Sequence, residues 1–193
     1  MKVGIFGGSF NPIHIGHAII ASHVIQHADL DQIWLMVAPL NPLKEPNVHN
    51  NDIDRLRMTE LVTRQIEGLE TSAFEFTLPR PSYTINTLHA LQEKFPQHEF
   101  SLIIGADNWA VFKKWKDWKE IIDNHDILIY PRLGYKVTIP EEYAHRVKLT
   151  DAPIIEISST QIREGLAKGE NMRFYVPDDV YRYILTNHLY QHE

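Results

Sequence analysis

The sequence contains no cysteine, and this absence excludes several classes of protein at once. Disulfide scaffolds, thiolate nucleophiles and thiolate zinc sites all require that residue. The chain also lacks an excess of positive charge, since 19 Lys and Arg stand against 25 Asp and Glu, for a net charge of −6. A protein that binds nucleic acid non-specifically relies on a basic surface, so we expect no nucleic acid partner.

Long hydrophobic runs are missing as well. No apolar stretch approaches the roughly 18 residues of a membrane helix, and the one that follows Met1 is too short for the core of a signal peptide. We therefore expect a cytoplasmic protein with no membrane partner. The 193 residues are 44% hydrophobic and 23% charged, which is typical of a globular chain, and this length favours a single domain over residues 1–193. Assembly into a homo-oligomer remains open.

Short apolar segments alternate with helical segments along the chain, and this rhythm predicts an α/β fold with a parallel sheet covered by helices on both faces. We expect the helical segment from about 159 to 190 to pack on that sheet. Ligands of such sheets bind beyond the carboxyl ends of the strands. The expected strands are residues 3–6, 33–37, 100–104, 126–130 and 154–157 and a strand through Phe74 and Phe76; the expected helices are residues 16–28, 52–65, 84–94, 178–188 and one that begins at Ser159.

A glycine-rich turn directly follows the first expected strand. Residues with no Cβ let an anion approach the backbone N–H groups closely. The turn matches neither the GxxxxGK pattern nor the GxGxxG pattern of the common nucleotide-binding loops. His14 and His17 come next, at the start of a helix whose dipole attracts anions, so both imidazoles are placed to donate to a phosphate. The phosphate site predicted here contains Gly7, Gly8, Ser9, Phe10, His14 and His17.

Two other interpretations of this segment remain. The histidines could be incidental surface residues, or the H-x-x-H spacing could hold a metal, with His23 and His27 further along the same helix. At 100° per residue His23 and His27 lie well round the helix from His17, and no cysteine could add a ligand. We predict no protein-held metal.

Residues 7–17, GGSFNPIHIGH, resemble the G-G-S/T-F-D-P-x-H-x-G-H signature of the HxGH nucleotidyltransferase superfamily. The resemblance implies a Rossmann-like, doubly wound sheet and the transfer of a nucleotidyl group from ATP or CTP. Asn11 stands where many members carry Asp. The amide keeps a turn-forming side chain but loses the charge, so no charge-dependent role is assigned to this position.

A second segment, Ser158-Ser159-Thr160-Gln161-Ile162-Arg163, follows an apolar stretch. Ser158 and Gln161 have the spacing of a capping box, which explains the segment as a helix start. Arg163 does not fit that explanation, because an uncompensated cation near a helix N-terminus opposes the helix dipole unless an anion binds there. The segment resembles the ISSTxIR motif of the same superfamily. That resemblance implies contacts of Ser158, Ser159 and Thr160 with adenine and of Arg163 with the ATP phosphates.

Lys44 lies on a loop that contains Pro39, Pro42 and Pro46. Loop lysines are usually solvated, but a proline-stiffened loop loses less entropy when its lysine docks on a phosphate. Residue chemistry alone leaves the two interpretations even. Relatives in the superfamily carry a similar Pro-x-x-Lys loop, which implies that Lys44 binds phosphate.

Four further segments, PSYT from Pro81, IIGAD from Ile103, Lys114-Trp115 and Arg132-x-Gly-Tyr, each have an ordinary explanation. Thr84 and Asp107 could be helix caps, and Trp115 could belong to an amphipathic surface helix. Together, from Val3 to about Asp179, they resemble the bacterial nicotinate-nucleotide adenylyltransferase family. The resemblance implies that Thr84 and the backbone near Trp115 hold a nicotinate carboxylate, that Gly105 and Asp107 meet the nucleotide sugar, and that Arg132 lines the pocket together with Ser9 and Lys44.

The activity implied by this resemblance is adenylyl transfer from ATP to nicotinate mononucleotide, which yields deamido-NAD and pyrophosphate. His14 and His17 would stabilise the α-phosphate, and Lys44 and Arg163 the β- and γ-phosphates. Mg²⁺ would enter with ATP and keep most of its waters, without a dedicated protein cage. Two alternatives remain: a nucleotidyltransferase of this fold with another acceptor, and a nucleotide-binding module without catalysis.

Overall fold

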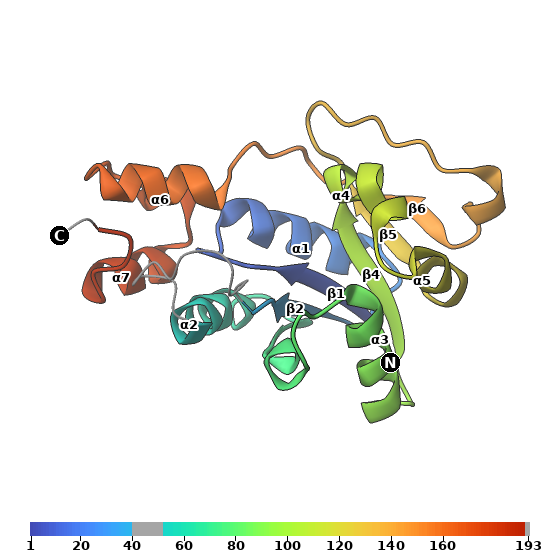
Figure 1. Cartoon of the computed structure of the whole chain (residues 1–193). Helices are drawn as coiled ribbons and strands as arrows, with labels where there is room; N and C mark the ends of the chain where they lie inside the picture. Colours follow the sequence, from blue (N-terminus) through green and yellow to red (C-terminus); the bar gives the residue numbers. More distant parts are fainter. Residues whose placement is uncertain (40–51, 192–193) are drawn as a thin grey trace.

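The computed structural model describes residues 1–39 and 52–191, and its centre is a 6-stranded sheet in which every strand pair is parallel (Figure 1). The strand order is β3-β2-β1-β4-β5-β6. The direction of winding reverses between β1 and β4, which is where ligands bind in folds of this order. The expected Rossmann-like parallel sheet is confirmed. The strands are β1 (Lys2–Gly8), β2 (Gln32–Val37), β3 (Leu69–Ser72), β4 (Glu99–Gly105), β5 (Ile127–Tyr130) and β6 (Val147–Leu149).

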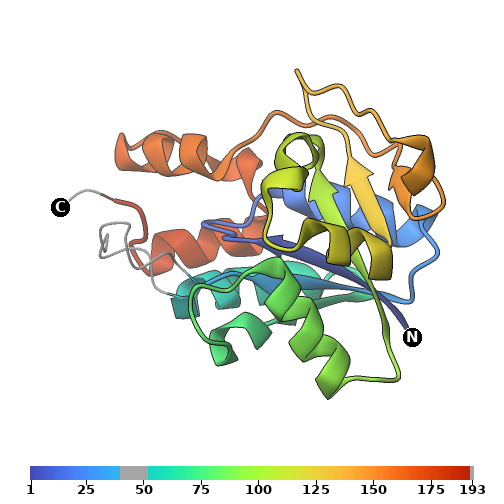
Figure 2. The same cartoon turned by 45° about the vertical axis from the view of Figure 1, so that its right-hand side comes forward.

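Helices cover both faces of the sheet and enclose two separate apolar cores (Figures 1 and 2). Helices α1 (Ile15–His27) and α2 (Asp52–Thr63) pack on one face, and α3 (Thr84–Lys94) and α5 (Trp118–Asn124) pack on the other. All four residues of β5 are buried, as the continuous apolar strand patterns predict. The remaining helical segments are α4 (Ala106–Val111), α6 (Ser159–Ala167), α7 (Asp178–Thr186), η1 (Phe74–Thr77), η2 (Phe112–Lys114), η3 (Glu141–Tyr143) and η4 (Arg173–Tyr175).

The prediction of a strand through Phe74 and Phe76 is wrong. These residues form the 3₁₀ turn η1, and the strand is the four-residue β3 just before it. The alternation that suggested a strand has another cause: Phe74 packs against the core on one side of the sheet and Phe76 against the core on the other. A turn at the edge of a sheet can reach both faces, and its residues then imitate the two-residue period of a strand.

The strand expected at residues 154–157 is also absent; the edge strand is instead β6. The chain leaves the sheet after Leu149 and runs over α1 toward α6 (Figure 1). Pro153 has no N–H with which to continue a ladder, and Ile154 is 52% exposed. The apolar segment 154–157 therefore crosses α1 without pairing to a strand of the sheet.

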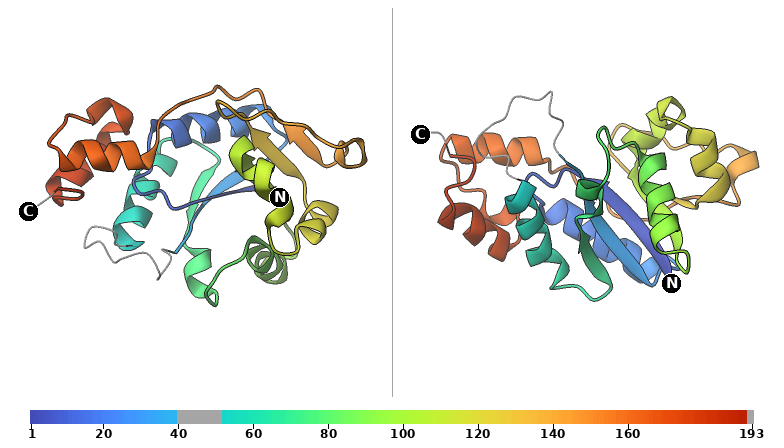
Figure 3. Two further views of the ribbon diagram at one scale, coloured as in Figure 1. Left: turned by 45° about the horizontal axis from the view of Figure 1, so that its top comes forward. Right: turned by 60° about the horizontal axis from the view of Figure 1, so that its bottom comes forward.

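The C-terminal helices lie together at one end of the molecule (Figure 3). Helix α7 contacts α2, and its Val180 and Ile184 are fully buried in the same core as α1. Tyr183 Oη donates to Asp54 Oδ1 on α2 over 2.7 Å, and Tyr190 Oη donates to Asn11 Oδ1 over 2.6 Å. The end of the chain is thereby attached to the loop that follows β1. Within the described residues no helix is both long and apolar enough to cross a membrane.

The bond between Tyr190 and Asn11 gives a stability test. Tyr190→Phe removes a buried hydrogen bond, since Tyr190 is 6% and Asn11 5% exposed, and we expect a loss of about 1–2 kcal/mol of unfolding free energy. Tyr181→Phe is the matched control because its bond to Asn171 is exposed; this change should stay within about 0.5 kcal/mol. Urea unfolding of the three proteins makes the comparison, and equal stabilities would show that the bond contributes nothing.

Candidate active site

The loops that follow β1 and β4 meet at the point where the sheet reverses. Gly7 and Gly8 at the end of β1 and Gly105 at the end of β4 line one cavity of about 530 Å³. A Cβ on Gly105 would lie 2.2 Å from Asp107 Oδ1, so only glycine leaves room for that carboxylate. The expected location of the site at the carboxyl ends of the strands is therefore matched by a cavity.

The glycine turn has an exposed backbone and a buried anchor. Gly7 and Ser9 are exposed, and a Cβ built on Gly7 would meet nothing within 4 Å. Phe10 is 1% exposed and has a φ of 45°, and its ring lies where a Cβ on Gly8 would be only 2.9 Å away. Phe10 thus holds the turn by its side chain, and only its backbone can face a nucleotide.

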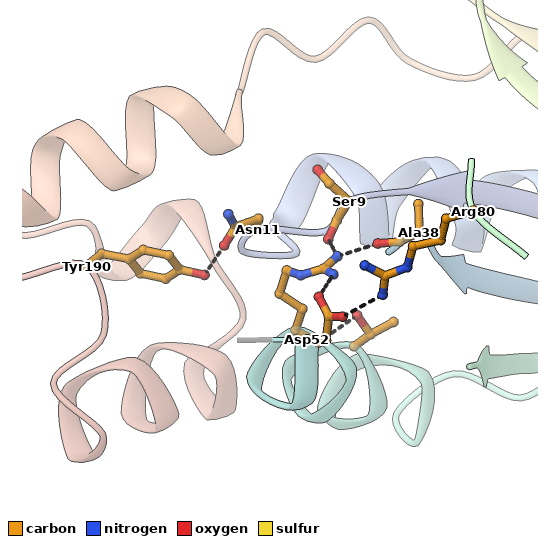
Figure 4. A network of polar contacts seen from close by, with 8 residues as sticks. Ser9, Asn11, Ala38, Asp52, Arg80 and Tyr190 are labelled. Atoms are coloured by element: carbon orange, nitrogen blue, oxygen red, sulfur yellow. Dashed lines mark hydrogen bonds and ion pairs between the residues drawn. The ribbon is translucent and has the colours of Figure 1, made fainter. Parts of the chain in front are cut away.

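A buried arginine that the sequence did not indicate, Arg55, holds this turn; Figure 4 shows the residues that it bonds, Ser9, Ala38 and Asp52. Arg55 on α2 is 0% exposed, and its Nη1 donates to Ser9 O over 2.5 Å and to Ala38 O over 2.8 Å. Its Nη2 donates to Asp52 Oδ1 over 2.5 Å. One guanidinium therefore fixes the loops after β1 and β2 relative to α2. The only sequence signal was the i, i+3 spacing of Asp52 and Arg55, which is common on exposed helix faces.

The two histidines form a reciprocal cap at the start of α1. His14 Nδ1 accepts from the backbone N–H of His17 over 3.4 Å, and His17 Nδ1 accepts from that of His14 over 3.3 Å. The rings stack with centroids 3.6 Å apart. A Cβ on Gly16 would lie 3.0 Å from the His14 ring, so the glycine between the histidines permits this packing.

This geometry also sets the proton positions. A backbone N–H can only donate, so each Nδ1 is an acceptor and each ring carries its proton on Nε2. Burial, together with the nearby charge of Arg132, lowers the pKa of His14 to about 4. Burial, with His14 and Arg132 adding to it, lowers the pKa of His17 well below its usual value. Both rings are therefore neutral Nε2–H donors at neutral pH.

The N-terminus of α6 lies against the loop after β1. Ser158 Oγ caps the helix by accepting from the N–H of Gln161 over 3.1 Å, as predicted. Ser159 Oγ donates to Pro12 O over 2.9 Å. Arg163 Nη1 donates to Asn11 O over 2.7 Å, and its Nη2 donates to Thr160 Oγ1 over 3.2 Å. Both acceptors are neutral, so these bonds orient the guanidinium without neutralising its charge.

Asp107 and Arg132 face each other beside the cavity. Asp107 Oδ1 and Arg132 Nε lie 3.8 Å apart, and neither atom has a hydrogen-bond partner among the described residues. Arg132 also donates to Tyr130 Oη over 3.2 Å. Arg132 lies next to the lining of the cavity, which includes Tyr130. The two atoms therefore keep hydrogen-bonding capacity for polar groups of a ligand.

The cavity brings together two of the expected substrate residues, Thr84 and Trp115. Thr84 is the first residue of α3 and not its cap, since the N-cap is Tyr83 and no side chain bonds to the helix end there. No side chain therefore caps the N–H groups of the first turn of α3, and the Thr84 hydroxyl is not a helix cap. Lys44 lies outside the described residues.

Two charged residues of the cavity, Glu75 and Arg80, were not predicted. Glu75 accepts from Thr87 Oγ1 over 2.9 Å, and burial raises the pKa of its carboxyl group. Arg80 reaches back to Asp52, with 3.7 Å between Nη2 and Oδ2. Both residues lie where the sequence pattern indicated a strand and its turn. No local signal separates charges that face a cavity from charges that face water.

A larger cavity of about 870 Å³ lies at the opposite, amino end of the strands. It contains none of the predicted site residues, and its charged groups are largely paired within the protein, as in Lys2 with Asp29 and His23 with Asp151. The described residues include no group of three or more His, Asp or Glu that could hold a metal ion. The polar chemistry expected from the motifs is concentrated at the carboxyl end.

The shifted pKa of His14 predicts how stability depends on pH. Between about pH 6.5 and 4 the unfolded chain gains a proton on this residue that the folded chain excludes, so the free energy of unfolding falls as pH falls. The loss is at most about 3 kcal/mol. His14→Asn keeps a capping oxygen but cannot titrate, so its urea midpoint should fall less than that of the wild type over this range. The same pH dependence in both proteins would contradict the assignment.

Comparisons with known proteins agree with this arrangement. The sequence profile of the cytidylyltransferase-like family matches residues 5–165. A protein of Flavobacterium johnsoniae named "Probable nicotinate-nucleotide adenylyltransferase" is 46% identical over 192 residues, which cover 99% of this chain and 100% of the relative. One of Bacteroides fragilis with the same name is 45% identical over 184 residues, with coverages of 95% and 91%.

Solved structures show the same fold. The Plasmodium falciparum nicotinic acid mononucleotide adenylyltransferase complexed with NaAD superposes with a TM-score of 0.78, covering 98% of this chain and 97% of that chain at 18% identity. The complex of the same enzyme with APC gives a TM-score of 0.76. At this identity the structures establish the fold alone. The relatives at 45–46% identity over nearly the whole chain establish the family. The chain belongs to the cytidylyltransferase-like family and, within it, to the nicotinate-nucleotide adenylyltransferases.

Proposed function

We propose that this chain transfers the adenylyl group of ATP to nicotinate mononucleotide. An oxygen of the 5′-phosphate of the mononucleotide attacks the α-phosphorus of ATP, and the bond from that phosphorus to the bridging oxygen of the β-phosphate breaks. Pyrophosphate leaves with the bonding electrons, and deamido-NAD remains. The attacking phosphate is largely ionised near pH 7, so no general base is required. Catalysis then consists of positioning and charge stabilisation.

One observation carries this proposal: the Gly7-Gly8 turn joins the wall of the Thr84 and Trp115 cavity to the loop that ends in the histidine pair. A mononucleotide whose ring lies near Trp115 has its phosphate directed to that turn. The α-phosphate of ATP binds on the other side, near the histidines. A cavity and a donor pair on the two sides of one exposed turn suit a reaction that joins two nucleotides through their phosphates.

The histidines supply donors without adding charge. Each neutral Nε2–H can donate to a non-bridging oxygen of the α-phosphate, and the donation strengthens as negative charge develops there. Fixed donors in a buried site need no reorganisation during the reaction. The stacking and the reciprocal cap hold His14 and His17 in that geometry before substrate arrives.

The remaining phosphate and sugar contacts are assigned in the same proposal. Arg163 and Lys44 bind the β- and γ-phosphates; Arg163 lies on α6 next to the Asn11 carbonyl. Asp107 receives the ribose hydroxyls through Oδ1, which has no hydrogen-bond partner among the described residues. Ser158, Ser159 and Thr160 at the start of α6 contact the adenine. The side chains of Ser158 and Ser159 already hold the helix end and the Pro12 carbonyl, so the backbone groups make these contacts.

Magnesium belongs to the substrate in this proposal. Mg²⁺ retains several waters and is commonly held by substrate phosphates together with one or two carboxylates. In this proposal the phosphates of ATP carry the ion, which would supply positive charge against the leaving pyrophosphate.

The role of His17 is testable by mutation. If His17 contacts the α-phosphate mainly in the transition state, His17→Ala should lower kcat by roughly 10²–10³ with little change in the KM for ATP. His17→Gln keeps an N–H donor and should recover part of the loss. His27→Ala on the exposed face of the same helix is the matched control and should leave kcat unchanged. A near-normal kcat for His17→Ala would remove it from catalysis.

The choice of acceptor tests the function itself. Nicotinate and nicotinamide mononucleotides differ by a carboxylate in place of a carboxamide. A pocket of N–H donors near Thr84 and Trp115 favours the anion, because the amide turns its own NH₂ toward a donor. A lost charge-assisted bond and an unpaired donor together cost roughly 3–5 kcal/mol, so kcat/KM should favour the acid by about 10²–10⁴. Pyrophosphate release with ATP and each mononucleotide measures the ratio.

Phosphopantetheine and glycerol 3-phosphate serve as controls in that assay. Release with one of them alone would assign the chain another acceptor. Binding of ATP without release for any acceptor would indicate a nucleotide-binding module. Equal rates for the acid and the amide would contradict the carboxylate pocket while leaving adenylyl transfer intact.

A further inference from the structure

The cavity that contains Thr84 and Trp115 has a single cationic side chain, Arg80, among the described residues that line it. Its other charged residue is Glu75. Glu75 is already engaged, because Thr87 Oγ1 donates to it over 2.9 Å and Ser82 Oγ over 3.5 Å. An anionic ligand that enters this cavity would meet that carboxylate, and among the described residues of the lining Arg80 alone carries the opposite charge.

Arg80 is held loosely enough to bind a ligand. The side chain is 48% exposed, and its ion pair with Asp52 has 3.7 Å between Nη2 and Oδ2, which is longer than a hydrogen bond. The residue lies between Pro79 and Pro81, whose fixed φ angles restrict the backbone that presents it. The guanidinium can therefore form new bonds with little loss of backbone freedom.

Asp52, which Figure 4 shows beside Arg80, is in turn fixed by the buried Arg55. Arg55 Nη2 donates to Asp52 Oδ1 over 2.5 Å, while the other carboxylate oxygen faces Arg80. Since Arg55 also holds Ser9 and Ala38, the position of Arg80 is linked to the loops that bind phosphate. Arg55 and Arg80 share the single carboxylate of Asp52, so these three side chains together carry a net positive charge.

We infer that Arg80 binds an oxyanion of the acceptor mononucleotide and thereby contributes to the choice of acceptor. This inference rests on the proposed function. The oxyanion belongs either to the nicotinate carboxylate or to the 5′-phosphate, and a planar guanidinium can bind both in the same two-bond geometry. Arg80 is a second contact, in addition to the Thr84 and Trp115 donors, and it also belongs to the lining of the cavity.

The test is the steady-state rate of Arg80→Met with ATP and each of the two mononucleotides. Methionine keeps most of the side-chain length and loses the charge. The matched control is Arg64→Met, directly after α2, because Arg64 forms a similar exposed ion pair, 3.6 Å from Glu60, away from the cavity. For Arg80→Met we expect kcat/KM for nicotinate mononucleotide to fall about 10- to 100-fold, with the KM for ATP unchanged.

The amide substrate identifies the bound group. If Arg80 binds the carboxylate, Arg80→Met lowers kcat/KM for the acid alone and the preference for the acid collapses. If it binds the 5′-phosphate, both substrates lose the same factor. Arg80→Lys retains a charge and should recover part of either loss. A merely structural role would instead lower the melting temperature and change the KM for ATP, which would overturn the inference.

Failure of the inference and failure of the proposed function give different results. If the wild type releases pyrophosphate with nicotinate mononucleotide and Arg80→Met stays within twofold of Arg64→Met for both acceptors, Arg80 is not a substrate contact. If the wild type releases none with either mononucleotide, the proposed function itself is wrong, and the inference falls with it.

Discussion

The guanidinium of Arg55 joins three parts of the chain: the loop after β1, the loop after β2 and the start of α2. It donates to carbonyl oxygens after β1 and β2 and to the carboxylate that begins α2. A buried charge costs several kcal/mol unless it is paired and hydrogen-bonded. Three acceptors bind the guanidinium here. Because one side chain holds both the loop after β1 and the loop after β2, these loops cannot move independently. The exposed glycine turn depends on this support from below.

The histidine pair combines a helix cap with the two donors that the proposed reaction uses. Each imidazole satisfies one backbone N–H at the start of α1, which stabilises the helix. That bond also decides the tautomer, and burial removes the charge, as the lowered pKa values of His14 and His17 express. Donors that are neutral and fixed can stabilise the negative charge that develops on the α-phosphate in the transition state. In the proposed reaction the two roles fall on different nitrogen atoms of the same rings, because Nδ1 caps the helix and Nε2 carries the hydrogen that is donated.

The C-terminal segment completes the site from a distance in sequence. Tyr190 and Arg163 both bond to Asn11, one to its side chain and one to its carbonyl. Ser159 bonds to the neighbouring Pro12 carbonyl. The loop after β1 is therefore held from two sides, by α2 and by the last helices of the chain. A residue that differs from the usual Asp of the motif, Asn11, is part of this attachment, and its amide oxygen accepts the Tyr190 hydroxyl group without a charge.

Most of the fold followed from local chemistry. Apolar strands with glycine turns and helices between them imply a parallel sheet, and the motifs Gly7–His17 and Ser158–Arg163 were located by residues adjacent in sequence. Phe74 and Phe76 were misread because packing on two faces of a sheet edge has the period of a strand. The segment 154–157 was misread because an apolar stretch can cover a helix instead of pairing.

The partners of Arg163, Arg80 and Tyr190 could not be predicted, because they lie on different elements or far apart in the chain. A hydrogen bond between residues 179 positions apart, as between Asn11 and Tyr190, leaves no periodic trace in sequence. The same holds for the protonation of His14, which depends on burial by the whole fold. Sequence alone thus determined which chemical groups this protein has and which strands present them. The tertiary structure decided which of those groups are paired, neutral or available to a ligand, because pairing and desolvation are properties of neighbours in space.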